Sequence, residues 1–238
     1  MYEFVLNFEN IETNDFEANE KVRTAEIIQK GVNKLIGTEI IDRTKNSVII
    51  KEMAESSFEG FYPTLRRVFL LLIQLSEDFS EGIKNHDLKL LKTIESQHDT
   101  ISKFLSFCLR LLNKIGHPDP RKSTFYYRVL VHLHEITDIY KFTSLWIVVL
   151  NGINKKLKKQ ICEIIDETNN AFKLFYEFFY KYESKKLLSL SEQITKVRKA
   201  VEKLADSGSS YDVMVLARVT HLTYILEFLI ETKIALEF

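Results

Sequence analysis

The sequence predicts a mainly α-helical protein: two tandem three-helix bundles, with six long antiparallel helices and pseudo-twofold symmetry, preceded by a small N-terminal β-α-β-β segment. Only three Pro and seven Gly occur in 238 residues, so few positions interrupt a helix. From about residue 57 onward, apolar residues recur with helical spacing between short polar stretches. Residues 79–103 also align with residues 175–199, and both stretches precede a loop and a further helix. These observations together favour a duplicated helical bundle.

Residues 1–55 form the predicted N-terminal α+β segment. "YEFVLNFE" (2–9) alternates apolar and polar residues, which is typical of a half-buried strand. "NEKVRTAEIIQKGVNKLI" (19–36) has the apolar stripe of a helix, and Gly37 follows as a helix stop. "TEIIDR" (38–43) and "SVIIKEM" (47–53) flank "TKN", which predicts a hairpin.

Six helices are expected in the rest of the chain. Asp87 is the expected N-cap of the second helix, and Asn151-Gly152 the end of the third. Helices this long, joined by tight turns, pack as antiparallel neighbours. The first bundle would span 56–152 and the second 153–238. The expected helices are 58–84, 88–114, 124–150, 155–182, 185–205 and 211–237.

The composition excludes several classes of protein. Lys+Arg and Asp+Glu both number 33, so no basic surplus points to a direct nucleic-acid partner. The longest apolar runs (68–75 and 144–150) are shorter than the roughly 20 residues of a membrane-spanning helix, so no membrane insertion is expected. The N-terminus lacks the pattern of a secretory signal. Cys108 and Cys162 match no metal or redox spacing, which favours reduced thiols in a cytoplasmic protein.

"HEITD" (134–138) begins like the H-E-x-x-H signature of zinc hydrolases, but Asp138 stands where the second His is needed. His134 and Asp138, four residues apart, share a helix face, and Glu135 can reach a neighbouring site. No G-x-x-x-x-G-K-[ST] or G-x-G-x-x-G loop is present, so no nucleotide cofactor is expected.

Several stretches resemble the phosphate-uptake regulator (PhoU) family, in particular its archaeal PhoU-like domain proteins. They are "LRRVFLLLIQLSEDFSEGIKNHDLKLL" (65–91), "DTISKFLSFCLRLLN" (99–113), "LHEITDIY" (133–140) and "VNKLIGTEIIDRTKNSVIIKEM" (32–53). Archaeal relatives often begin with an AbrB-type DNA-binding domain, and nothing in this chain matches one. The resemblance implies a cytoplasmic, non-enzymatic regulator of phosphate uptake, often a homodimer. Such a regulator contacts a transporter subunit, here the ATPase of a phosphate ABC transporter. A PhoU-like accessory of another ion transporter or channel is the alternative.

Some members of that family bind iron or zinc through acidic pairs on the second and third helices of each bundle. In this chain His98 and Ser102 stand at the acidic positions of the second helix. Imidazole with carboxylate suits zinc or iron. Solvated charges on an outer helix face are the alternative interpretation. An enzyme is a third, with His98, His134 and Asp138 as ligands and Glu135 as base. The candidate metal set of the first bundle is His98, Asp99, His134, Glu135 and Asp138.

The second bundle departs further from the family pattern. Ala217 replaces the acidic residue, and His221 stands at the Asp position. Lys196, Arg198 and Lys199 lie on the matching face, where cations would repel a metal ion. No metal is therefore expected in the second bundle.

Two further stretches indicate contact surfaces. "FKLFYEFFYKY" (172–182) carries more rings than one helix stripe can bury, so some should be exposed unless another surface covers them. Core filling is expected for most of these rings, and Phe178, Phe179 and Tyr182 are the predicted contacts in a dimer or with a partner. "NKKLKKQ" (154–160) carries four Lys, either for an anionic partner or as a solvated junction between the bundles.

Overall fold

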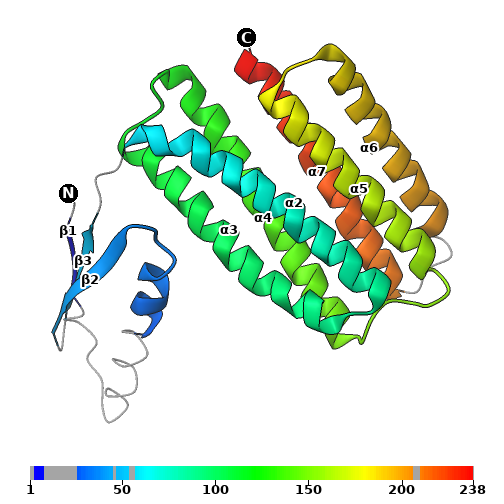
Figure 1. Cartoon of the computed structure of the whole chain (residues 1–238), viewed down its shortest axis with the longest axis horizontal. Helices are drawn as coiled ribbons and strands as arrows, with labels where there is room; N and C mark the ends of the chain where they lie inside the picture. Colours follow the sequence, from blue (N-terminus) through cyan, green and yellow to red (C-terminus); the bar gives the residue numbers. More distant parts are fainter. Residues whose placement is uncertain (1–2, 8–25, 45–46, 54–56, 206–209, 238) are drawn as a thin grey trace.

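The structure is a computed structural model that describes residues 3–7, 26–44, 47–53, 57–205 and 210–237. It has the predicted architecture: six long helices and a small three-stranded sheet at the N-terminal end (Figure 1). Residues 19–25 of the helix predicted at 19–36 lie outside the described residues. The described part of that helix covers residues 26–32.

The sheet is antiparallel, with β3 (Ser47–Glu52) between β1 (Glu3–Asn7) and β2 (Thr38–Arg43). The predicted hairpin of β2 and β3 is confirmed. The helix ends before Gly37, whose φ of +75° serves the turn into β2, and Met53 N–H donates to its carbonyl. Lys114 pairs with Glu52 at 2.9 Å, which ties the sheet to the helical part of the chain.

The long helices begin and end within three residues of the predicted bounds. Apolar residues recur along each of them with helical spacing, and few Gly or Pro residues interrupt this pattern. A single 3-10 turn, Phe58–Gly60, leads into the first of them. They are α2 (Phe61–Asn85), α3 (Leu88–Lys114), α4 (Ser123–Val149), α5 (Lys158–Tyr180), α6 (Ser184–Ala205) and α7 (Ser210–Glu237).

Residues with specific turn and capping preferences determine two of the turns between the helices. The Asp87 carboxylate accepts hydrogen bonds from the N–H groups of Lys89 and Leu90, both at 3.0 Å, so the predicted N-cap of α3 is confirmed. Asn151 and Gly152 have φ of +57° and +111°, which turns the chain just past the end of α4. A Cβ on Gly152 would come within 2.8 Å of the His86 ring, so a side chain there would meet both strain and a clash.

The helices pack in two sets of three, as predicted. In the first set (α2, α3 and α4), α3 packs against α2 and α4; in the second set (α5, α6 and α7), α6 packs against α5 and α7. The two sets meet where α2 packs against α5 and where α4 packs against α7 (Figure 1). The four helices α2, α4, α5 and α7 therefore form the middle of the helical part, and α3 and α6 lie on either side of them. The internal sequence repeat stays a prediction.

A buried polar network crosses the boundary between the two sets. Tyr140 Oη on α4 donates to Asn169 Oδ1 on α5 at 2.6 Å, and Asn169 Nδ2 donates to the Ser76 carbonyl on α2 at 2.7 Å. Burial raises the pKa of the Tyr140 hydroxyl, so it stays a neutral donor at ordinary pH. These buried hydrogen bonds, which are shielded from water, thus join α2, α4 and α5.

The aromatic side chains of 172–182 are less exposed than predicted. Phe178 and Phe179 are buried, and the Phe179 ring lies 5.0 Å from that of Phe69 on α2. The expectation that they are exposed is wrong, because α5 packs against α2 on one side and α6 and α7 on the other. A helix between three neighbours buries more than one stripe. Tyr182 remains 36% exposed, and its role as a partner contact stays a prediction.

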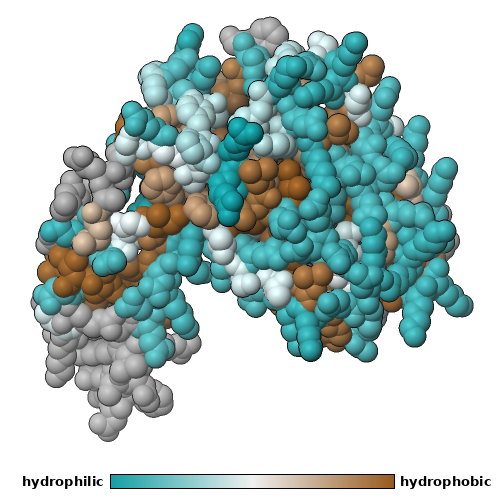
Figure 2. All heavy atoms as spheres, viewed as in Figure 1, coloured by the Kyte–Doolittle hydropathy of each residue, from teal (hydrophilic) through white to brown (hydrophobic). Residues whose placement is uncertain are grey.

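The surface of the helical part is mostly hydrophilic in the view of Figure 2, with hydrophobic residues in small areas between charged ones. By length and composition α7 is apolar enough to cross a membrane, but half of its most apolar stretch is buried among the other helices. Core helices share this property.

Candidate metal site

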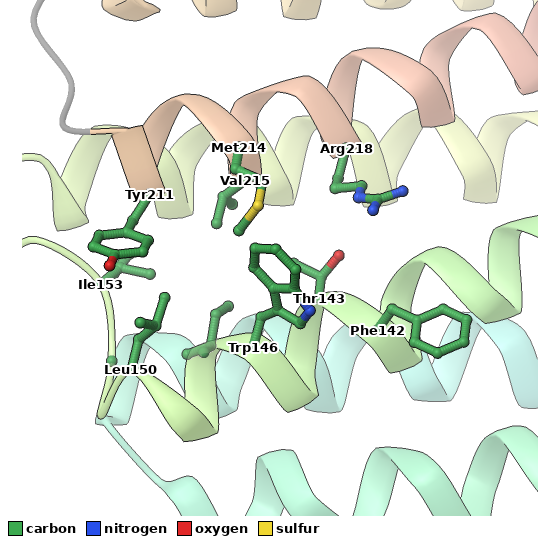
Figure 3. Close-up of a pocket in the computed structure, with 11 residues that line it drawn as sticks. Phe142, Thr143, Trp146, Leu150, Ile153, Tyr211, Met214, Val215 and Arg218 are labelled. Carbon is green, nitrogen blue, oxygen red and sulfur yellow. The ribbon is translucent and has the colours of Figure 1, made fainter.

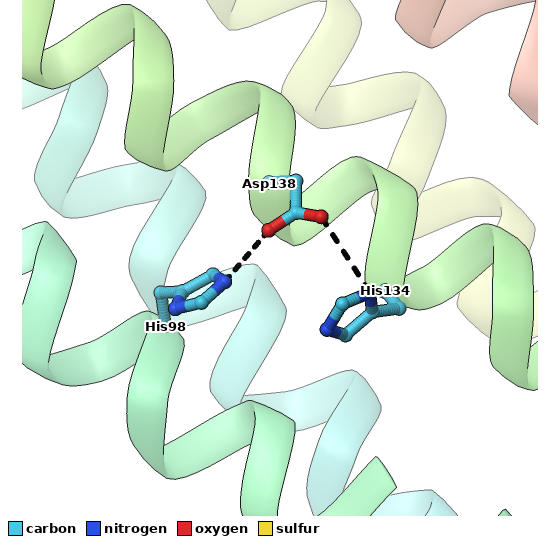
Figure 4. Close-up of side chains that lie close together, drawn as sticks. All are labelled: His98, His134 and Asp138. Carbon is cyan, nitrogen blue, oxygen red and sulfur yellow. Dashed lines mark hydrogen bonds and ion pairs between the residues drawn. The ribbon is translucent and has the colours of Figure 1, made fainter. Parts of the chain in front are cut away.

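Three of the predicted ligand residues meet between α3 and α4. His98 lies on α3, and His134 and Asp138 lie one turn apart on α4, with the Asp138 carboxylate between the two rings (Figure 4). One nitrogen or oxygen atom from each side chain can be chosen so that all three lie within 4.8 Å of one another. The antiparallel packing of α3 and α4 produces this meeting, because residue 98 faces residue 138 while residue 102 faces residue 134.

The distances between these atoms are compatible with a tetrahedral ion. Ligand bonds of 2.0–2.1 Å place neighbouring donor atoms about 3.3 Å apart around zinc. His134 Nδ1 and Asp138 Oδ2 are 3.5 Å apart, close to that value. His98 Nε2 and Asp138 Oδ1 are 2.7 Å apart, a hydrogen bond that an ion would open by about 0.6 Å. Three protein ligands leave a fourth position to solvent or a partner, and His134 and Asp138 are 46% and 36% exposed.

Asp99 has a different place from the one predicted. Its Oδ1 lies 3.0 Å from His98 Nδ1, on the side of the ring away from Asp138. A carboxylate that holds the second ring nitrogen orients a metal-binding His and fixes its tautomer. Burial raises the pKa of the Asp99 carboxyl, but the His98 hydrogen bond and the charge of Lys141 outweigh it, so the pKa lies below its usual range. Asp99 is thus an ionised orienting group.

Glu135 does not join the group. Its Oε1 lies 3.0 Å from His221 Nε2 on α7, and its Oε2 lies 3.3 Å from His132 Nδ1 on α4. Glu135 therefore contacts the second set of helices, whereas His134 and Asp138 face α3. His132 was not among the predicted site residues, although its spacing of three residues from Glu135 places the two on one helix face.

Two of the three cations expected to repel a metal ion in the second set have carboxylate partners. Lys196 Nζ lies 2.7 Å from Glu167 on α5, and Arg198 forms two hydrogen bonds of 2.7 Å with Glu227 on α7. The Arg198 guanidinium also lies 4.1 Å from the centre of the Tyr224 ring. Within the described residues, the His98, His134 and Asp138 group alone brings three metal-binding side chains this close together.

The chain was compared with known proteins by sequence and by structure, and the structural comparison found a similar fold. No protein-family model matches the chain, and no curated protein matches it either. A similar solved structure is that of a protein from Shewanella oneidensis MR-1, described as a PhoU-like phosphate regulatory protein. The similarity covers 74% of this chain and 94% of that one, with a TM-score of 0.50 and 14% sequence identity. This chain has a PhoU-like helical fold. At so low an identity the comparison shows the fold and no more.

Proposed function

We propose that this protein is a non-enzymatic, cytoplasmic regulator of phosphate uptake that acts by contact with the ATPase subunit of a phosphate transporter. The observation that supports this proposal is the similarity in fold, over 74% of the chain, to a protein described as a PhoU-like phosphate regulatory protein. Three of the four stretches that resemble the PhoU family in sequence lie on α2, α3 and α4, and the fourth (32–53) includes β2 and β3.

The arrangement of the candidate site favours a regulator over a metal-dependent enzyme. A catalytic metal needs an open coordination position in a site that shields the reaction from water. Here His134 and Asp138 lie partly exposed between α3 and α4. The residue expected to act as base, Glu135, is paired with His132 and His221 instead.

Within this function, we propose that His98, His134 and Asp138 hold one zinc or iron ion, with Asp99 orienting His98. Nitrogen and carboxylate donors from two helices suit either metal. When bound, the ion would cross-link α3 to α4. After incubation with zinc and dialysis, metal analysis should find about one equivalent per chain, and His134→Ala should remove it. Protein that stays metal-free in excess zinc would show that these side chains form only a hydrogen-bonded cluster.

The regulator proposal is tested by purifying the tagged protein from its native cells, grown with and without phosphate, and identifying bound proteins by mass spectrometry. Capture of a phosphate-transporter ATPase in amounts that change with phosphate supply is the expected result. Capture of a subunit of another ion transporter or channel would keep the docking mechanism and change its purpose. If neither culture yields a membrane-associated partner, the regulator proposal is wrong and the similarity concerns the fold alone.

A further inference from the structure

One end of the helical part carries exposed apolar side chains beside a run of lysines. At this end α4 stops, the connection 150–157 leads into α5, and α7 begins (Figure 1). The turn between α2 and α3 lies at the same end, since His86 lines one hollow together with Gly152 and Lys155. We name this end, made of residues 85–88, 146–159 and 210–214, the basic tip.

Apolar side chains of the basic tip are open to solvent. Val149, the last residue of α4, is 82% exposed, and Trp146, one turn earlier, is 48% exposed. In the first turn of α7, Tyr211 is 57% exposed. Trp146 and Leu150 face Tyr211 and Met214 across a shallow groove between α4 and α7, as Figure 3 shows. Side chains this exposed add little to the stability of the fold, so they are available to contact another surface.

The chain that follows these apolar residues is strongly basic. Residues 142–162 contain four Lys and no Asp or Glu. Among the described residues, no carboxylate oxygen lies within 4.0 Å of the Nζ atoms of Lys155, Lys156 and Lys158, and Lys159 has one at 4.0 Å. The N-terminus of a helix already carries partial positive charge, so lysines at the start of α5 are unfavourable for the helix itself. The fold therefore does not account for this run of lysines.

The acidic side chains around the basic tip leave a surplus of positive charge. Asp212, in the first turn of α7, is 1% exposed and accepts a hydrogen bond from Asn154 N–H at 3.4 Å. Asp166 on α5 is paired with Lys84 at 2.5 Å, and the Asp87 carboxylate caps α3. These carboxylates are thus engaged within the protein, and the lysines after α4 face solvent.

A basic hollow adjoins the apolar groove. It has a volume of about 300 Å³, and the residues His86, Lys155 and Lys158 line part of it. The hollow and the groove share Gly152 and Ile153, so the two are neighbours on the surface. The ammonium groups of lysine bind phosphate as point charges. Apolar contacts and phosphate contacts can therefore be made by one continuous surface.

This combination is typical of a membrane contact and unusual for a protein–protein interface. Lysine is depleted from protein interfaces. Segments that lie on a membrane place Trp and aliphatic side chains at the boundary between headgroups and acyl chains, while lysines contact anionic lipids. Such segments bury their apolar side by about 5–10 Å, and Trp146 lies about 6 Å from Leu150 along the axis of α4. The exposed apolar side chains of the basic tip can therefore reach that depth together.

We infer that the basic tip binds the surface of a membrane that contains anionic phospholipid. Trp146 and Val149 enter the boundary between headgroups and acyl chains, and the lysines of 154–160 contact the lipid phosphates. The contact is peripheral, because the apolar part of the tip is far shorter than the roughly 20 residues of a membrane-spanning helix. The inference does not depend on the regulator proposal, since its test uses only the purified protein and lipid.

Trp146 is the only Trp in the chain, so its fluorescence reports on the basic tip. The full chain is mixed with vesicles of phosphatidylcholine alone or of phosphatidylcholine with phosphatidylglycerol. With the anionic vesicles, the protein should sediment with the lipid and the emission of Trp146 should shift to the blue. Raising NaCl from about 50 mM to about 500 mM should release most of the protein, because salt screens the lysines. Vesicles of phosphatidylcholine alone should bind much less protein.

Two matched charge changes locate the contact. Lys155→Glu with Lys156→Glu should weaken binding to the anionic vesicles by about 25-fold or more, since each Lys near such a surface contributes about fivefold. Lys185→Glu with Lys186→Glu changes the charge by the same amount at the start of α6, at the opposite end of the helical part (Figure 1). This control should bind within about twofold of the wild type, because it lies beyond the Debye length of about 10 Å.

Two matched apolar changes test the insertion of side chains. Val149→Ser should weaken binding by about fivefold, because part of the apolar area that enters the lipid is lost. Leu188→Ser alters a side chain on α6 that is 63% exposed and should leave binding unchanged. Circular dichroism checks that each variant is folded. If the charge-reversed tip variant is not, Lys155→Gln with Lys156→Gln takes its place, with an expected loss of about 25-fold.

Four results would overturn the inference. The first is a protein that does not sediment with anionic vesicles at low salt. The second is equal binding to vesicles with and without phosphatidylglycerol, which would mean that charge does not select the surface. The third is an equal loss in the two charge variants, or an unchanged Trp146 emission, which would place the contact elsewhere. The fourth is release from vesicles by inorganic phosphate but not by chloride at the same ionic strength, which would make the hollow a site for the free anion.

Discussion

Replacing Asp99 by Asn should weaken zinc binding without removing a metal ligand. Asp99 Oδ1 lies 3.0 Å from His98 Nδ1 and would hold the ring so that Nε2 faces the ion. Loss of such an orienting carboxylate typically lowers metal affinity by about 10–100-fold, or about 1.4–2.7 kcal/mol. Since the Asp99 side chain is 45% exposed, water replaces part of the interaction. The lower end, about 10-fold, is therefore the expected loss.

Glu135→Gln is the matched control for Asp99→Asn. Both variants remove one negative charge from the predicted set, but Glu135 faces His132 and His221. Titration of each protein with zinc in competition with a chromophoric chelator should give a normal affinity, within about twofold, for Glu135→Gln. Equal losses in the two variants would refute the assignment of roles, because they would mean that total charge rather than geometry holds the ion.

Three further changes test the fold. Tyr140→Phe leaves buried Asn169 Oδ1 without its donor and should cost about 1–3 kcal/mol in urea unfolding, with a Tm lower by about 2–4 °C per kcal/mol. Asp87→Ala removes the N-cap of α3 and should cost about 0.5–2 kcal/mol. The hydrogen bond from Lys196 holds the pKa of Glu167 below its usual range. The ionised Glu167 carboxylate therefore stabilises the folded protein above its unfolded pKa of about 4.3, and this stabilisation is lost as pH falls through its lower pKa in the folded state. Glu167→Gln should remove this loss, so the free energy of unfolding should fall less steeply with pH in the acid range.

The bounds of the long helices could be predicted because they depend on local information. Apolar periodicity defines each helix, and the signals at Asp87 and at Asn151-Gly152 define two of the turns within a few residues of chain. The burial of Phe178 and Phe179 could not be predicted in the same way. It depends on how many neighbours surround α5, and a single helix pattern does not contain that number.

The candidate site shows the same division between local and tertiary information. His132 and His134 are two residues apart on α4, so their side chains point about 200° apart around the helix axis. One faces α7 and the other faces α3. Sequence spacing groups His134 with Asp138 and His132 with Glu135, but it does not say which neighbouring helix each pair meets. The five residues that form one set in the sequence are therefore divided by the packing around α4. Asp138 bridges helices within the first set and Glu135 joins that set to the second, so substitutions at these positions should affect metal binding and the α4–α7 contact separately.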